Sequence, residues 1–230
     1  METEMKHPPT PLRVARRGMV LYMVASRARF EVHKDREEAS LYRSNLLKRV
    51  REIALDDELE SAERQMLHAE IGALDERTVV HSTWRYEGAA VLAWALGRLD
   101  LPPVYEPVSD RAVGGVFFDM SYDSDSFTLR DSETIESFEE LMYNLHWRVR
   151  DFSIRPRPYD LRRMFSDVPS LTGVAPVRFL DDDLAIGDVP IFRAPRDRFI
   201  TCHSVVSERR HAASWLCGHH EQYSEVPLDT

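Results

Sequence analysis

The sequence contains only two cysteines, Cys202 and Cys217, among its 230 residues. Both lie on one expected helix, fifteen residues apart, which corresponds to about 22 Å at ~1.5 Å of rise per residue. A disulfide needs Cα atoms within about 7 Å of each other, so the two thiols cannot be joined while that helix is intact. Few and unpaired cysteines are typical of the reducing cytoplasm. The sequence therefore predicts a cytoplasmic protein without disulfides.

Long hydrophobic runs are also missing. An apolar stretch from Gly18 to Ala25 follows three arginines, as the core of a signal peptide would, but it has only eight residues. A membrane-spanning helix needs about 20. Glu2 and Glu4 interrupt the basic start that a signal peptide requires. We therefore interpret the stretch as part of a first helix and predict no membrane partner.

Positive charge is scarce: Lys and Arg number 30 against 39 Asp and Glu, which gives a formal net charge of −9. Binding to nucleic acid requires a basic face that displaces counterions, so a nucleic-acid partner is not predicted. An acidic protein is better suited to a basic protein partner. The sequence also lacks a Gly-rich phosphate loop and a nucleophile motif, so it predicts no cofactor and does not favour an enzyme.

No Gly/Ser-rich or Pro-rich linker and no internal repeat divides the chain, and its 43% hydrophobic residues are sufficient for a sizeable core. We predict a disordered tail over residues 1–10 and a single helical domain over residues 11–230. The expected fold is mainly α, a bundle of about six helices with one small β-hairpin before the last helix. The predicted helices span residues 12–30, 36–54, 57–73, 78–99, 131–150 and 196–217, and the predicted hairpin spans 183–192. Pro190 restricts the second strand of this hairpin to an edge.

Two charged residues stand where the helical pattern predicts core. Glu87 lies between Trp84 and Trp94 on the apolar face of the fourth helix, which we expect to be central, and Arg209 lies on the apolar face of the last helix. An unpaired charge in a core costs several kcal/mol, so each needs a partner. The simplest pairing joins Glu87 to Arg209, although helical phase alone leaves other neighbours open.

Five segments of the sequence carry a resemblance to a known family. They are Trp84–Gly97, Tyr143–Trp147, Asp183–Gly187, Glu208–Leu216 and Val226–Thr230. Together and in this order they resemble the bacterial domain of unknown function DUF4272, over about residues 13–230. Ala213 and Ser214 stand where the last helix of the family typically has Leu and Asn. The resemblance implies a helical single-domain fold in a bacterial protein, and it implies no reaction.

The candidate site is a polar cluster that the anomalous charges define. Its members are Arg85, Glu87, His146, Glu208 and Arg209, with Asp110 or Asp229 as further candidates. As a site, a buried Glu would act as general base, His146 as its proton partner, and an Arg would hold an anionic substrate. As structure, the same residues would lock helices together through charge-assisted hydrogen bonds. The structural interpretation is favoured because no catalytic motif accompanies the cluster.

Three other residue sets have simpler explanations than a site. The aromatic anchors Trp84, Trp94, Trp147 and Trp215 recur at helical spacing, which is more typical of core than of a ligand cage. The thiols and imidazoles of residues 202, 203, 217, 219 and 220 lack the short spacing of a zinc site, so no metal is predicted. Residues 181–183 are interpreted as a solvated acidic turn, since calcium loops are spaced differently.

We therefore expect a non-catalytic interaction protein of the adaptor or immunity kind that binds a basic protein through an acidic surface. The alternative is an enzyme or ligand-binding protein that uses Glu87, Arg209 and His146. An enzyme requires a pocket that contains these charges, whereas an interaction protein requires an exposed patch elsewhere. The sequence predicts neither the identity of the partner nor the oligomeric state.

Overall fold

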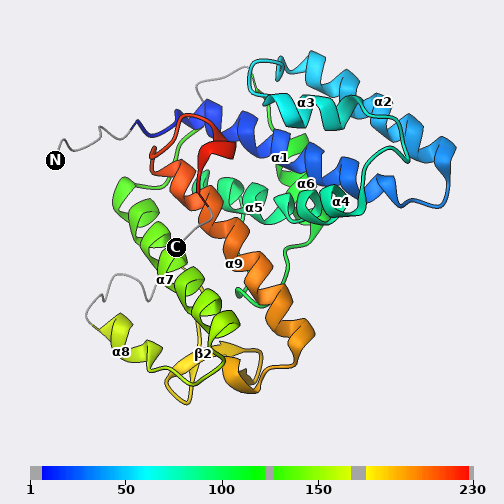
Figure 1. The fold of residues 1–230 in the computed structure, drawn as a ribbon. Coiled ribbons are helices and arrows are strands. Elements are labelled where there is room, and N and C mark those ends of the chain that lie inside the picture. Colours follow the sequence, from blue (N-terminus) through cyan, green and yellow to red (C-terminus); the bar gives the residue numbers. More distant parts are fainter. Residues whose placement is uncertain (1–6, 123–126, 167–174, 228–230) are drawn as a thin grey trace. The chain divides into compact units, whose positions relative to one another are not determined.

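The computed structural model describes residues 7–122, 127–166 and 175–227. It is mainly helical, with a small antiparallel sheet before the last helix, so the predicted fold class is confirmed (Figure 1). Internal contacts divide the chain into two compact units. We call residues 10–99 and 109–129 the α1–α6 unit, and residues 1–9, 100–108 and 130–230 the α7–α9 unit. Compactness does not establish separate folding, so the single domain over 11–230 stays a prediction, and most of the predicted tail lies outside the described residues.

The α1–α6 unit is arranged around its first helix, α1. Its helices are α1 (Pro11–Glu31), α2 (Arg36–Glu52), α3 (Ser61–His68), α4 (Glu76–Thr83), α5 (Arg85–Ala95) and α6 (Asp110–Phe118). Thr10 caps α1, Pro11 occupies its first turn, and most of its residues are buried. α1 packs against α2, α3, α4, α5 and α6. α1 therefore takes the central position that we predicted for the fourth helix.

Two glycines allow α6 to pack closely against α1. A Cβ on Gly18 of α1 would lie 2.3 Å from the ring of Phe117, and a Cβ on Gly114 of α6 would lie 2.6 Å from the hydroxyl of Tyr22. Both distances are shorter than any ordinary van der Waals contact. Small residues at these two positions therefore set the distance between the helices.

Two buried arginines attach α1 to the segments around α3. Arg17, which is 1% exposed, donates to the backbone oxygen of Glu58 at 3.0 Å and forms an ion pair with Glu63. Arg27 is fully buried; it donates to Glu31 at 2.7 Å and to the backbone oxygen of Ala69 at 3.0 Å. These contacts explain how charged residues remain in a core helix, because each guanidinium has carboxylate and carbonyl partners.

The α7–α9 unit contains two long helices and the sheet. Its elements are α7 (Ser132–Ile154), α8 (Leu161–Ser166), β1 (Phe179–Leu180), β2 (Asp183–Ile186), β3 (Val189–Pro190), η2 (Ile191–Arg193), α9 (Arg196–Leu216) and η3 (Tyr223–Glu225). α7 packs along α9 (Figure 1). The strand order is β1-β2-β3, with Ala185 opposite Pro190. Pro190 therefore lies on an edge strand, as predicted.

Five elements differ from the sequence prediction. The third helix, predicted over residues 57–73, is shorter, because α3 spans only Ser61–His68. The predicted fourth helix is divided into α4 and α5 at Trp84, next to Thr83, whose hydroxyl donates to the backbone oxygen of Val79 at 2.8 Å. Such a bond competes with the backbone bonds of a helix. Helix α6 occupies a segment that was predicted as loop. The prediction missed this helix because Gly114 and Gly115 lower the helix propensity of the segment. The predicted irregular segment contains α8, and strand β1 extends the predicted hairpin to three strands.

Candidate functional site

The structure divides the predicted polar cluster between the two units. Arg85 and Glu87 belong to α5 in the α1–α6 unit, whereas His146, Glu208 and Arg209 belong to α7 and α9 in the other unit. Glu87 is 2% exposed and Arg209 is fully buried, which agrees with their predicted place on apolar faces. The pairing of Glu87 with Arg209 stays a prediction.

Arg209 has partners within its own unit. Its Nη1 donates to the backbone oxygen of Pro102 at 2.7 Å, and its Nη2 donates to the backbone oxygen of Glu106 at 3.5 Å. Carbonyl oxygens carry partial negative charge but no ionisable proton. These contacts therefore hold the 100–108 segment on α9, and they fit the structural interpretation of Arg209.

Glu208 and its neighbours hold the chain that follows α9. The hydroxyl of Tyr223 donates to Glu208 at 3.1 Å, and the ring of Tyr223 stacks on His211 with centroids 4.3 Å apart. Arg210 donates to the backbone oxygen of Pro227 at 2.9 Å, and Trp215 donates to that of Glu221 at 3.5 Å. Four polar side chains of α9 thus bind the segment 221–227, which is a structural role.

His146 belongs to α7, which packs against α9, and is 3% exposed. Burial, and then the positive charge of Arg210, lower the pKa of His146 to about 4. The rings of His146 and His203 have centroids 6.2 Å apart, and burial also lowers the pKa of His203. Both imidazoles are neutral at pH 7, so neither is adjusted to accept a proton near that pH as a general base would.

Sequence reasoning missed the most completely buried ion pair of this unit. Arg148 donates to both carboxylate oxygens of Asp183, at 2.8 Å and 2.6 Å, and both side chains are fully buried. Asp183 also accepts from the backbone N–H of Tyr159 at 3.0 Å. The interpretation of residues 181–183 as a solvated turn is therefore wrong for Asp183. The position of Arg148 beside Leu145 and Val149 on α7 is the signal that identifies it.

The predicted aromatic anchors and thiols behave mainly as packing groups. Trp94 and Trp215 are buried, whereas Trp84 and Trp147 are partly exposed, and Trp147 packs edge-on against Tyr159. Both cysteines are buried and neither is in a disulfide, and burial raises the pKa of Cys202 to about 12. Within the described part of the chain, no three His, Cys, Asp or Glu side chains are grouped as metal ligands.

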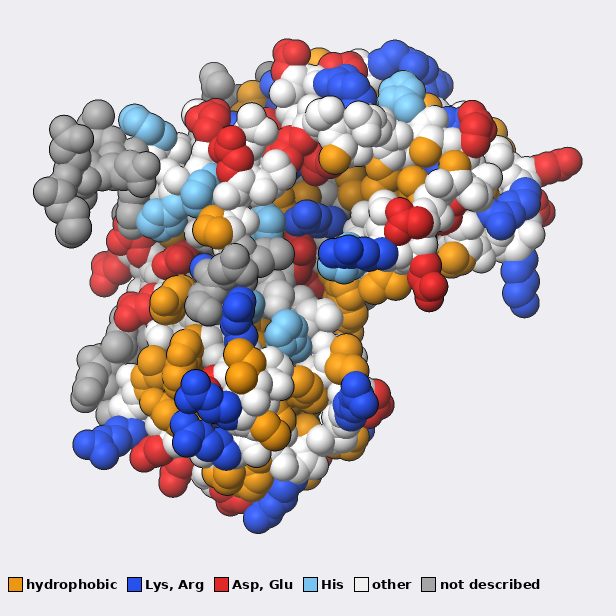
Figure 2. All heavy atoms as spheres, in the orientation of Figure 1, with side chains coloured by type: hydrophobic (Ala, Val, Ile, Leu, Met, Phe, Trp, Pro, Cys, Tyr) orange, Lys and Arg blue, Asp and Glu red, His pale blue; other side chains and the backbone are white. Residues whose placement is uncertain are grey.

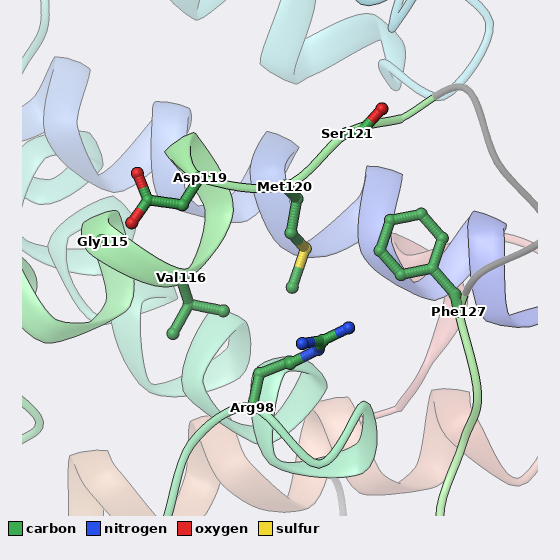
Figure 3. A pocket seen from close by; sticks show the side chains of 7 residues that line it. All are labelled: Arg98, Gly115, Val116, Asp119, Met120, Ser121 and Phe127. Atoms are coloured by element: carbon green, nitrogen blue, oxygen red, sulfur yellow. The ribbon is translucent and has the colours of Figure 1, made fainter.

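Two pockets are lined by other residues. The α6 pocket has a volume of about 390 Å³ and lies at the C-terminal ends of α5 and α6 (Figure 3). The hairpin pocket has a volume of about 520 Å³ and is bordered by the turn between β2 and β3 and the first turns of α9. None of the five residues of the predicted polar cluster lines either pocket.

The first half of α7 carries an acidic face. Glu133, Glu136 and Glu140 recur at a spacing of three and four residues and are all exposed; we call them the α7 acidic stripe. Their side chains form no hydrogen bond or ion pair within the described residues. Figure 2 shows acidic side chains gathered over this part of α7, at the left edge of the view. The stripe continues into Tyr143, which is 44% exposed.

The described part of the chain has no helix that combines the length and apolar character of a membrane span. No curated protein and no solved structure matches the sequence. A family model described as a domain of unknown function (DUF4272) matches residues 2–163, which is well over half of the chain. The protein therefore belongs to the DUF4272 family.

Proposed function

We propose that the protein is a cytoplasmic, non-catalytic interaction module, of the adaptor or immunity kind, that binds a basic protein through the α7 acidic stripe. The proposal depends on one observation: within the described residues, three exposed carboxylates lie on one face of α7 and their side chains form no ion pair or hydrogen bond. Residues 131–147 contain five carboxylates and no Lys or Arg. A field of one sign attracts an oppositely charged partner and accelerates its association.

A comparison with the other acidic segment supports this choice. Residues 56–63 also contain five carboxylates, but arginines of the same unit neutralise several of them. Arg64 pairs with Asp56 at 3.1 Å, Arg17 with Glu63, and Arg13 with Glu58 at 3.5 Å. That segment therefore presents a weaker field than α7.

Two aromatic side chains extend the stripe along the same helix. Tyr143 lies three residues after Glu140, and Trp147 lies four residues after Tyr143. The guanidinium of Arg210 lies over the ring of Tyr143, 5.6 Å from its centroid. Tyr, Trp and Arg are enriched at protein interfaces because they supply large contact areas with polar ends. A partner that binds the stripe would have apolar contacts as well as charge.

The alternative, a site that uses Arg85, Glu87, His146, Glu208 and Arg209, has less support. Arg209 and Glu208 have backbone and tyrosine partners, and His146 is neutral at pH 7. Recovery of a bound metabolite in place of a protein partner would favour this alternative.

Replacement of the stripe tests the proposal. Glu133→Gln, Glu136→Gln and Glu140→Gln are combined in one variant, and Glu37→Gln, Glu38→Gln and Glu52→Gln, all exposed on α2, are combined in a control with the same change in net charge. Each purified protein is used as bait in a lysate of the source organism at about 50 mM and about 200 mM salt. Charge–charge attraction at the surface is screened more strongly at the higher concentration.

The expected result is an equimolar, salt-sensitive protein partner that the wild type and the control retain and the stripe variant loses by about tenfold or more. Equal retention by all three proteins would contradict the stripe as the binding surface. Retention of a small molecule with no protein would contradict the interaction module itself.

A further inference from the structure

The α6 pocket combines one cation with an apolar wall. Its lining residues are Arg98, Gly115, Val116, Asp119, Met120, Ser121 and Phe127, all within the α1–α6 unit. Its volume of about 390 Å³ is at the lower end of the range for small-molecule sites. This size suits a small ligand or the end of a peptide.

The backbone at the end of α5 fixes the position of Arg98. Gly97 has a φ of 68°, and its N–H donates to the backbone oxygen of Trp94 at 2.9 Å. The N–H of Arg98 donates to the backbone oxygen of Ala93, also at 2.9 Å. This pair of bonds is a Schellman motif, which ends the helix and holds the next residue in a defined place. The backbone of Arg98, from which its side chain extends, is therefore fixed in position.

The guanidinium of Arg98 extends into the pocket toward Met120 and Phe127, whereas the carboxylate of Asp119 points to the other side of the α6 turn (Figure 3). No ion pair or side-chain hydrogen bond of Arg98 is present among the described residues. An arginine that is aimed into a pocket and has no carboxylate partner among the described residues is available to a ligand anion.

The opposite wall of the pocket is apolar and anchored. The hydroxyl of Tyr122 donates to the backbone oxygen of Phe117, in the last turn of α6, at 2.9 Å, and both rings are buried. This bond holds Met120 across the pocket, and Phe127 is 8% exposed beside it. The pocket therefore exists before a ligand binds, which lowers the entropic cost of binding.

We propose that the α6 pocket binds a carboxylate that carries a short apolar chain, with Arg98 as the anion-binding residue. A guanidinium pairs with a carboxylate through two parallel hydrogen bonds, and Val116, Met120 and Phe127 contact the chain. A phosphate monoester is a poorer match, because it carries about −1.5 to −2 charge at pH 7 and the lining offers one cation beside Asp119.

Octanoate is a suitable probe, with acetate and 1-octanol as probes that lack the chain or the charge. Each is titrated into the full-length protein by calorimetry. Octanoate is expected to bind at least about tenfold more tightly than either of the others. Arg98→Gln should weaken octanoate by about tenfold or more, whereas Arg111→Gln, an exposed arginine of α6 outside the pocket, should leave it unchanged.

Two further variants distinguish the contribution of the carboxylate charge to octanoate binding from that of the apolar chain. Asp119→Asn removes the nearby carboxylate and should strengthen octanoate binding, while Val116→Thr keeps the shape and should weaken octanoate but not acetate. Failure of octanoate to bind, equal binding of 1-octanol, or unchanged binding to Arg98→Gln would each overturn the proposal.

The carboxylate has two possible sources, a free aliphatic acid and the C-terminus of a peptide. A peptide that ends in Leu with a free carboxylate is compared with its C-terminal amide. Discrimination against the amide by tenfold or more, with binding tighter than octanoate, assigns a peptide terminus; the reverse order assigns a free acid. Neither result depends on the α7 acidic stripe, so this proposal and the proposed function can fail separately.

Discussion

At the scale of single residues, two glycines of the α1–α6 unit differ in the space around them. Gly18 lies directly against the ring of Phe117, which is fully buried. Gly115, three residues before the end of α6, has no atom within 4 Å of its Cβ position. The same substitution at these two glycines therefore has opposite consequences.

Gly18→Ala is expected to lower the free energy of unfolding by about 1–3 kcal/mol, because the added methyl overlaps a ring that has no room to move. Gly115→Ala is expected to raise it by about 0.5–1 kcal/mol through helix propensity. Urea unfolding followed by circular dichroism measures both. A neutral Gly18→Ala would show that α1 and α6 pack less closely than described.

His146 predicts how stability depends on pH. Its pKa is about 4 in the folded protein, below the usual 6.5, so between these values the unfolded chain binds a proton that the folded protein does not. The resulting stability is complete above pH 7 and is lost as the pH falls from about 6.5 to about 4, by about 3 kcal/mol. His146→Gln should flatten this loss relative to wild type, and exposed His81→Gln should not. Parallel curves for wild type and His146→Gln would contradict the prediction.

At the scale of elements, the sheet is joined to α7 by one buried ion pair. Strand β2 begins at Asp183, whose carboxylate accepts from Arg148 and from the backbone of Tyr159. All four residues of β2 are buried, so the pair lies in the packed part of the sheet. The pair therefore holds the sheet against α7. Arg148 also donates to the backbone oxygen of Arg157, which attaches the 157–159 segment to the same helix.

Asp183→Asn should remove the bidentate carboxylate of the buried Arg148 guanidinium and leave only Asp151, at 3.6 Å, as a counter-ion, at a cost of about 3–5 kcal/mol. For a chain of this length that corresponds to a fall in Tm of roughly 6–20 °C. Asp188→Asn, in the same hairpin but with a side chain that is 97% exposed, should change Tm by less than about 2 °C. Scanning calorimetry measures both, and a similar Tm for the two variants would show that the buried pair contributes little.

At the scale of the whole molecule, the chain passes between the two units at residues 9–10, 99–100, 108–109 and 129–130. Neither unit is a continuous piece of chain. Because each contains segments that are continued in the other, we expect them to unfold together, in agreement with the predicted single domain.

One calorimetric transition is therefore expected, with a van't Hoff enthalpy close to the calorimetric enthalpy. Gly18→Ala in one unit and Asp183→Asn in the other should each shift the entire transition. Two transitions, each moved by only one of the variants, would show instead that the units are separate domains.

A double-mutant cycle tests the predicted pairing of Glu87 with Arg209. Glu87→Gln alone is expected to cost about 3–5 kcal/mol if it removes one partner of a buried pair. In the double variant with Arg209→Gln, the total should differ from the sum of the single effects by about 0.5–3 kcal/mol. Additive effects would show that the two charges have separate partners.

Helical phase predicts where these charges lie, and it does not by itself identify their partners. Glu87 and Arg209 are buried as expected, because phase alone determines which residues share a face. Two partners of Arg209 are backbone oxygens of the 100–108 segment, more than 100 residues away in sequence. Every residue has a backbone oxygen, so no sequence pattern marks the ones that will accept.

The sequence by itself determined the mainly helical fold, the ends of the long helices and the edge position of Pro190, because propensity, capping and periodicity are local. The tertiary structure decided that α1 is the central helix of its unit, that Asp183 is buried against Arg148, and that Arg98 faces an apolar wall. Each of these depends on residues distant in sequence, and their proximity follows from how the helices pack.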